Sequence, residues 1–160
     1  YVPEIINAEG NGNLLPHNIR QFSEILIDKG AQKIFVLTDL DFDKCITETK
    51  KRISPLPDHI VIISIKEIEA WFLADVNSIR SFLNNPDFYC EFPETIPVPF
   101  DEIKRVRMQF CKRGVSDKKI LARTMIYKNG FSIENAAKHP NCKSAKYFLK
   151  KIEEATQSNS

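Results

Sequence analysis

The sequence predicts an α/β fold, in which a parallel sheet is flanked by helices and followed by a helical C-terminal part. Short apolar runs alternate with segments of helical spacing through the first 83 residues. A proline-rich stretch then interrupts this pattern, and after residue 100 the spacing is almost entirely helical. A chain of 160 residues suits one hydrophobic core, so we expect a single domain over residues 1–155 and a polar tail over 156–160.

The first expected strand covers residues 4–8 and runs into a turn that is rich in glycine and asparagine, residues 9–13. Pro16 suits a first helical turn, and Gly30 is the expected stop of that helix. Residues 34–38 then form a continuous apolar run, which is typical of a strand buried on both faces.

The alternation continues with a helix over residues 47–53, a third buried strand over 59–64, and a helix within 67–75. We expect Trp71 of this last helix to pack in the core. Asp75 is a candidate N-cap for a following helix over 76–82, since an aspartate oxygen can accept the first unpaired backbone N–H groups.

The second part of the chain begins with an irregular connection over residues 84–100, which contains four prolines. Helical spacing then predicts four helices, with Ser116 as the N-cap of the second of them. Their expected ranges are 101–112, 116–128, 132–138 and 143–154.

The charge is distributed unevenly along the chain. Residues 1–100 hold nine Lys and Arg against fifteen Asp and Glu, whereas residues 101–160 hold fourteen against six. The formal net charge of +2 therefore combines an acidic first part with a basic second part, a pattern that favours an anionic partner.

The four cysteines are scattered and form no CxxC pair, so neither a zinc site nor a disulfide framework is expected. No apolar run approaches the roughly 20 residues that span a bilayer. No signal peptide is recognisable at the start, and we expect a cytoplasmic protein without a membrane partner.

Acidic residues follow all three expected strands. Ligands of an open parallel sheet bind beyond the carboxyl ends of its strands, and clustered carboxylates repel one another unless a cation joins them. Oxygen ligands favour a hard cation, so we expect Mg²⁺, with Mn²⁺ as the alternative. The candidate metal ligands are Glu9, Asp39, Asp41, Asp43, Glu67 and Glu69.

Two other chemistries also begin with this kind of acidic run. A calcium-binding EF-hand loop is excluded, because it requires Gly and Glu where the chain has Lys44 and Lys50. A phosphoaspartyl-type phosphatase remains a minor alternative, with Asp39 as nucleophile and Asp41 as general acid.

The Glu9-Gly10 turn after one strand and the Asp39-Leu-Asp41 run after the next resemble the TOPRIM domain. That domain is the metal-dependent catalytic module of topoisomerases, DnaG-type primases, recombination proteins and OLD-family nucleases. The run IKEIEAWFLAD over residues 65–75 and the helical tail over 117–148 resemble a group of small stand-alone bacterial TOPRIM-like proteins linked with mobile elements or defence.

The resemblance implies catalytic or metal-ligating roles for Glu9, Asp39 and Asp41, and a second metal at Glu67 and Glu69. It also implies a lysine that assists at the phosphate, for which Lys143 is the candidate. The family fold contains a fourth parallel strand, whereas this sequence predicts three.

The expected function is Mg²⁺-dependent phosphodiester hydrolysis of DNA or RNA, with defence against mobile elements as the expected setting. The alternative is a non-catalytic module that binds nucleic acid or a protein partner in a defence complex; the oligomeric state stays open. Basic side chains in the second part could hold the phosphate backbone. They are Arg105, Arg107, Lys112, Arg113, Lys118, Lys119, Arg123 and Lys146.

Overall fold

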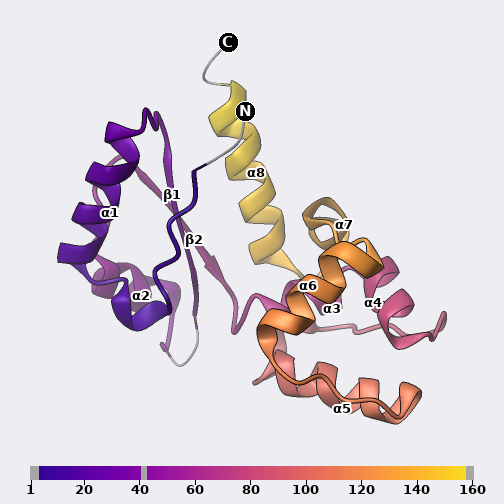
Figure 1. The fold of residues 1–160 in the computed structure, drawn as a ribbon. Helices are drawn as coiled ribbons and strands as arrows, with labels where there is room; N and C mark the ends of the chain where they lie inside the picture. Colours follow the sequence, from indigo (N-terminus) through magenta and orange to yellow (C-terminus); the bar gives the residue numbers. More distant parts are fainter. Residues whose placement is uncertain (1–3, 41–42, 158–160) are drawn as a thin grey trace. The chain divides into compact units, whose positions relative to one another are not determined.

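The structure, a computed structural model, describes residues 4–40 and 43–157. Among these residues it has a mixed α/β fold, with eight α-helices and a small two-stranded parallel sheet (Figure 1). The chain divides into two compact units, residues 1–63 and 64–160. The boundary therefore lies before the helices of residues 69–83, inside the alternation that the sequence predicts for the first 83 residues. The single domain over residues 1–155 stays a prediction.

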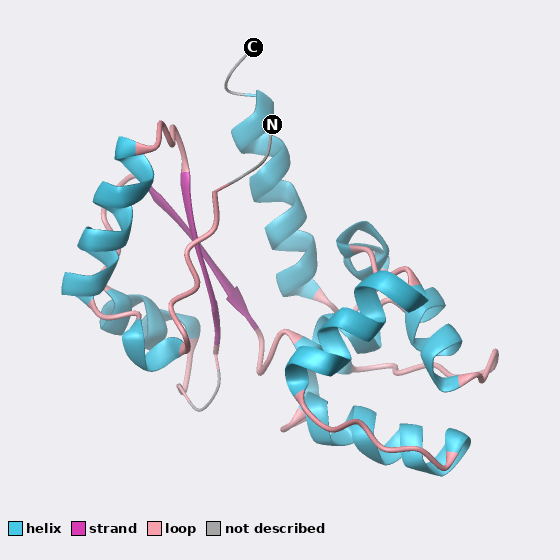
Figure 2. Cartoon of the chain, viewed as in Figure 1, coloured by secondary structure: helices cyan, strands magenta, loops and turns pink. Residues whose placement is uncertain are grey.

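The first unit contains the sheet and two helices (Figure 2). Strands β1 (Ile34–Asp39) and β2 (His59–Ser64) lie close to their expected ranges. A short 3₁₀ turn, η1 (Asn11–Asn13), precedes helix α1 (Pro16–Asp28), and α2 (Ile46–Ile53) lies between the strands in the sequence. The helices and strands share one apolar core, which consists of Leu14, Ile19, Val36, Ile53, Val61 and Ile63.

The strand predicted over residues 4–8 is absent, so the described part of the sheet has two strands instead of three. The side chain of Ile5 is 81% exposed, and only Ala8 of this segment packs against the core. The Asn7 side chain accepts a hydrogen bond from the Glu9 N–H (2.9 Å). Ile6 and Ala8 are only partly buried and the residues on either side of them are exposed, so the segment lacks the buried face that holds a strand in a sheet.

The two strands differ in burial. Residues 61–64 of β2 are all buried, as expected. We expected the apolar run over residues 34–38 to be buried on both faces. This prediction is wrong for β1, because Leu37 is 41% exposed while Val36 and Thr38 are buried. Alternating burial of this kind marks a strand with one face against a core.

The second unit is built from helices around α3 (Glu69–Ala74), in which every residue is buried. Helix α3 contacts α4, α5, α7 and the 3₁₀ turn η2, and α4 in turn contacts α5 and α6. The other elements of this unit are α4 (Val76–Leu83), η2 (Pro93–Thr95), α5 (Pro99–Cys111), α6 (Lys118–Asn129), α7 (Ile133–Lys138) and α8 (Lys143–Gln157). Trp71 is 2% exposed, which confirms its expected place in the core. No described helix has both the length and the apolar character that crossing a membrane requires.

Acceptor side chains begin three of these helices. Asp75 accepts a hydrogen bond from the Ser78 N–H (3.1 Å) at the start of α4, which confirms its capping role, and Ser132 caps α7. The N-cap of α6 is Asp117 and not Ser116, because the Asp117 carboxylate accepts from the Ile120 N–H (2.8 Å) and the helix starts at Lys118. Gly130 ends α6 with φ of 67°, a conformation that glycine adopts at little cost.

Replacement of Asp75 should destabilise the second unit. Its carboxylate is fully buried, and its other oxygen accepts from the Ser132 N–H (2.9 Å) before α7. Asp75→Ala leaves the buried Ser78 N–H and the partly buried Ser132 N–H without this acceptor, and we expect the free energy of unfolding to fall by about 2 to 4 kcal/mol. Urea denaturation measures this loss; Asn77→Ala on the exposed side of α4 is the control and should change stability by less than about 0.5 kcal/mol.

Candidate metal centre

The Glu9-Gly10 turn is held by asparagine side chains. Asn13 Nδ2 donates to the Ala8 carbonyl (2.9 Å), and Asn18 Nδ2 donates to the Asn13 carbonyl (2.9 Å). Glu9 and Gly10 both have positive φ, 59° and 120°. Glu9 is exposed, so this turn holds an acidic residue in contact with solvent just before η1.

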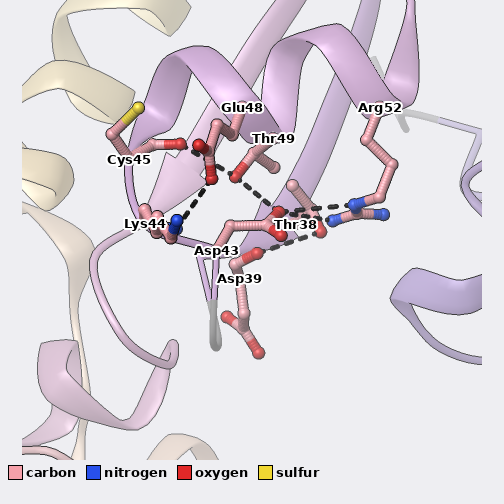
Figure 3. A network of polar contacts seen from close by, with 8 residues as sticks. All are labelled: Thr38, Asp39, Asp43, Lys44, Cys45, Glu48, Thr49 and Arg52. Atoms are coloured by element: carbon pink, nitrogen blue, oxygen red, sulfur yellow. Dashed lines mark hydrogen bonds and ion pairs between the residues drawn. The ribbon is translucent and has the colours of Figure 1, made fainter.

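The acidic run after β1 begins with Asp39, the last residue of the strand, and continues to Asp43 (Figure 3). Asp43 Oδ2 accepts from Thr49 Oγ1 (2.8 Å) and pairs with Arg52 Nη2 (3.1 Å). The Thr49 hydrogen bond, followed by those of Arg52, holds the pKa of Asp43 below its ordinary value. Asp43 therefore fastens the loop after β1 to helix α2, and its negative charge already has a cationic partner.

Two of the three predicted acids of this run, Asp39 and Asp43, lie within the described residues. The Asp39 carboxylate points away from the Asp43 carboxylate in Figure 3. Asp41 lies outside the described residues. Within residues 4–40 and 43–157, no three His, Cys, Asp or Glu side chains lie close enough to hold a metal ion. A metal site at Glu9, Asp39 and Asp41 stays a prediction.

Glu67 and Glu69, the predicted ligands of a second metal, lie in the second unit and share a lysine. Lys118 Nζ is 2.7 Å from Glu67 Oε1 and 3.5 Å from Glu69 Oε2. The other oxygen of Glu67 accepts from the Phe100 N–H (3.2 Å). The ammonium group of Lys118 thus supplies positive charge to both carboxylates, while a role of Lys118 in binding nucleic acid stays a prediction.

The start of α8 reveals a residue that the sequence reasoning missed. Lys143, the candidate catalytic lysine, is exposed at the first position of this helix. Its backbone N–H and that of Ser144 donate to the carboxylate of Glu94 (2.9 and 2.8 Å), which is only 8% exposed. Ser144 Oγ also donates to Glu94 and accepts from Trp71 Nε1 (2.7 Å). A sequence signal for Glu94 is absent, because 49 residues separate it from Lys143.

The predicted nucleic-acid-binding residues all lie in the second unit, and some have acidic partners. Arg105 Nη2 pairs with Glu102 Oε1 (2.7 Å), and this bond lowers the pKa of Glu102. Arg107 lies over the ring of Phe82, with the guanidinium carbon 4.3 Å from the ring centroid. The remaining predicted side chains are exposed at the end of α5 or on α6 and α8, namely Lys112, Arg113, Lys119, Arg123 and Lys146.

The Asp43 contacts can be tested by titration. Because Thr49 and Arg52 favour the ionised form, Asp43 should titrate below its ordinary pKa, and the stability that it contributes should be lost as pH falls through that lowered value. Thr49→Val and Arg52→Gln should each raise the Asp43 pKa, the first more strongly. Carboxyl-carbon NMR shifts in EDTA follow this group; a wild-type Asp43 that titrates at or above its ordinary value contradicts the observed contacts.

Glu94→Gln should weaken the start of α8. An amide offers one acceptor oxygen in place of two charged ones, so at least one of the buried donors loses its partner. We expect a loss of about 1 to 3 kcal/mol in the free energy of unfolding, with altered fluorescence of Trp71, the only tryptophan. Glu91→Gln, at an exposed side chain nearby in the sequence, is the matched control.

The chain matches no protein-family model, no curated protein and no solved structure. Its resemblance to the TOPRIM domain therefore rests on the quoted motifs alone and stays a prediction. The positions and contacts of individual side chains carry the functional argument.

Proposed function

We propose that this chain is a metal-dependent hydrolase of phosphodiester bonds in DNA or RNA, with a TOPRIM-type arrangement of acids. The observation that carries the proposal is the position of Asp39. It is the last residue of β1, at the carboxyl end of a parallel strand where ligands of α/β sheets bind. The Glu9-Gly10 turn and the Asp39-Leu-Asp41 run give the same motif pair in the sequence.

The donor set fits a hard divalent cation such as Mg²⁺ or Mn²⁺. Glu9, Asp39 and Asp41 offer only carboxylate oxygens, and Glu9 is exposed. Asp43 is less suited, because Arg52 already neutralises it. The ion pairs of Glu67 and Glu69 with Lys118 would have to break before the two carboxylates could bind a second metal ion.

Different residues of the chain would bind the metal ion, transfer a proton and bind the phosphate backbone. A bound Mg²⁺ would polarise the phosphate and lower the pKa of a coordinated water. Glu9 and Asp39 would hold the cation, and Asp41 would complete the set or accept a proton from the attacking water. Exposed cations of the second unit would contact the phosphate backbone.

A second candidate function is binding of nucleic acid without cleavage, which includes a role as one component of a defence complex. Several basic side chains of the second unit, Arg107 and Arg113 among them, have no ion pair to a carboxylate within the described ranges. Such cations favour a phosphate backbone whether or not a metal site exists.

The test is cleavage of supercoiled plasmid and of labelled DNA and RNA oligonucleotides with Mg²⁺, with Mn²⁺ or with EDTA. We expect metal-dependent cleavage by the wild type and a loss of at least about 100-fold for Asp39→Asn, which corresponds to about 2.7 kcal/mol of transition-state stabilisation. Asp58→Asn removes the same charge just before β2, at the amino end of a strand, and should cleave normally. Titration calorimetry with Mn²⁺ should show weaker metal binding by Asp39→Asn alone.

The results of these cleavage and binding measurements distinguish the hydrolase from the binding module and from the phosphatase. A wild type that binds oligonucleotides but never cleaves them under any of these metals favours the binding module. Turnover of small phosphomonoesters instead of diesters would favour the phosphatase alternative. Equal cleavage by the wild type and Asp39→Asn would contradict the assignment of Asp39.

A further inference from the structure

The second unit contains a pocket of about 580 Å³ between helices α4, α5 and α6. Three cationic side chains line it, Arg107, Arg113 and Lys128, and none of its lining residues is acidic. The volume lies in the range of small-molecule sites, roughly 300 to 1,000 Å³. A cavity of this size with cations and no carboxylate favours an anionic ligand.

Within the described residues, no carboxylate neutralises the three cationic side chains of the pocket. Within residues 4–40 and 43–157, none of them forms an ion pair with a carboxylate. By contrast, Arg105 on the same helix α5 and Lys118 on the same helix α6 both have glutamate partners. Phosphate binding to an unpaired cation is more favourable in free energy than binding to a cation that must first break an ion pair with a carboxylate.

Aromatic contacts hold part of the pocket wall in place. The guanidinium carbon of Arg107 lies 4.3 Å from the centroid of the buried Phe82 ring, and this cation–π contact holds the guanidinium group against the pocket wall. Phe110 is 42% exposed and meets Phe88 edge to face, with ring centroids 6.2 Å apart. The pocket therefore combines fixed positive charge with a partly exposed aromatic ring.

Amide side chains line the same pocket and are also oriented. Asn129 Oδ1 accepts from Ser81 Oγ (2.9 Å), and Asn129 Nδ2 donates to the Thr124 carbonyl (2.9 Å). Asn84 ends α4 in the left-handed conformation, with φ of 49°, and is exposed. These groups offer the hydrogen-bond donors and acceptors that the edge of a nucleobase requires.

We propose that this pocket binds one nucleotide unit. Arg107, Arg113 and Lys128 hold its phosphate, and its base stacks on Phe110 within reach of the asparagine amides. The ligand is a free nucleotide or one nucleotide of a single strand. In the second case the site rests on the proposed function, because it then holds the nucleic-acid substrate of the hydrolase.

The experiment measures binding in EDTA, so that it does not depend on a metal site. The probes are dTMP, thymidine, inorganic phosphate and a fluorescein-labelled oligothymidylate of twelve nucleotides. We expect dTMP or the oligonucleotide to bind, thymidine to bind at least 10-fold more weakly than dTMP, and affinity to fall as salt rises. Binding of dTMP as well as the oligonucleotide identifies a free-nucleotide site, and binding of the oligonucleotide alone identifies a strand site.

Variants locate the binding in the pocket. Arg107→Gln combined with Lys128→Gln should weaken binding at least 10-fold. The matched control combines Arg20→Gln with Lys138→Gln, which removes the same charges at exposed positions outside the pocket and should bind normally. Phe110→Ala should weaken nucleotide binding about 5-fold or more, because it removes the stacking surface, while inorganic phosphate binds as before.

Three results would overturn the proposal: no binding of dTMP or the oligonucleotide, equal binding by the double variant, or no effect of Phe110→Ala. Circular dichroism and urea midpoints verify folding, and Arg113→Gln at an exposed position replaces the double variant if that variant unfolds. Asp39→Asn should bind dTMP like the wild type. A wild type that binds dTMP but cleaves no nucleic acid thus contradicts only the hydrolase, and a wild type that cleaves but binds neither dTMP nor the oligonucleotide contradicts only the pocket.

Discussion

The helical unit depends on one buried carboxylate, that of Glu94. It accepts the first backbone N–H groups of α8, and Ser144 connects it to the indole of Trp71 on α3. A buried charge is tolerated when several donors surround it, as they do here. Trp71 also stacks on Phe148 of α8, with ring centroids 5.4 Å apart, so polar and aromatic contacts join the same two helices. Because α3 also contacts α4 and α5, this junction supports the helices that form the cationic pocket.

The Asp and Glu side chains of this chain differ in the groups that they contact, which are backbone N–H groups for some and cationic side chains for others. Asp75 and Glu94 are buried and bind backbone N–H groups, so they stabilise helices. Asp43 and Glu67 each have a cationic partner on a neighbouring helix. The excess of acid in the first hundred residues therefore does not measure the charge that remains for a metal. The basic excess divides in a similar way, into cations paired within the fold, the cations of the pocket, and other exposed cations such as Lys119 and Arg123.

The sequence predicts local features of this fold well. Apolar runs locate β1 and β2, helical spacing locates most helices within about two residues, and Asp75 is the expected cap of α4, whereas Asp117 caps α6 in place of the expected Ser116. It fails where the outcome depends on distant partners. Nothing in the run 4–8 indicates that it forms no strand, and no local pattern brings Glu94 to α8 or Lys118 to Glu67. Placing Asp39 at a strand end needs only the apolar run before it, whereas grouping it with Glu9 and Asp41 requires long-range geometry that no local pattern contains.

The backbone of Glu9 bears on how this chain could have been selected. A glutamate at φ of 59° is strained relative to glycine, which visits that region freely. A Glu-to-Gly exchange at position 9 would therefore relieve strain of about 1 kcal/mol, and it would also delete the acidic group. Selection for stability alone would favour glycine there. The same exchange therefore separates the stability of the turn from the proposed role of its carboxylate, since it would raise the first while it removes the second.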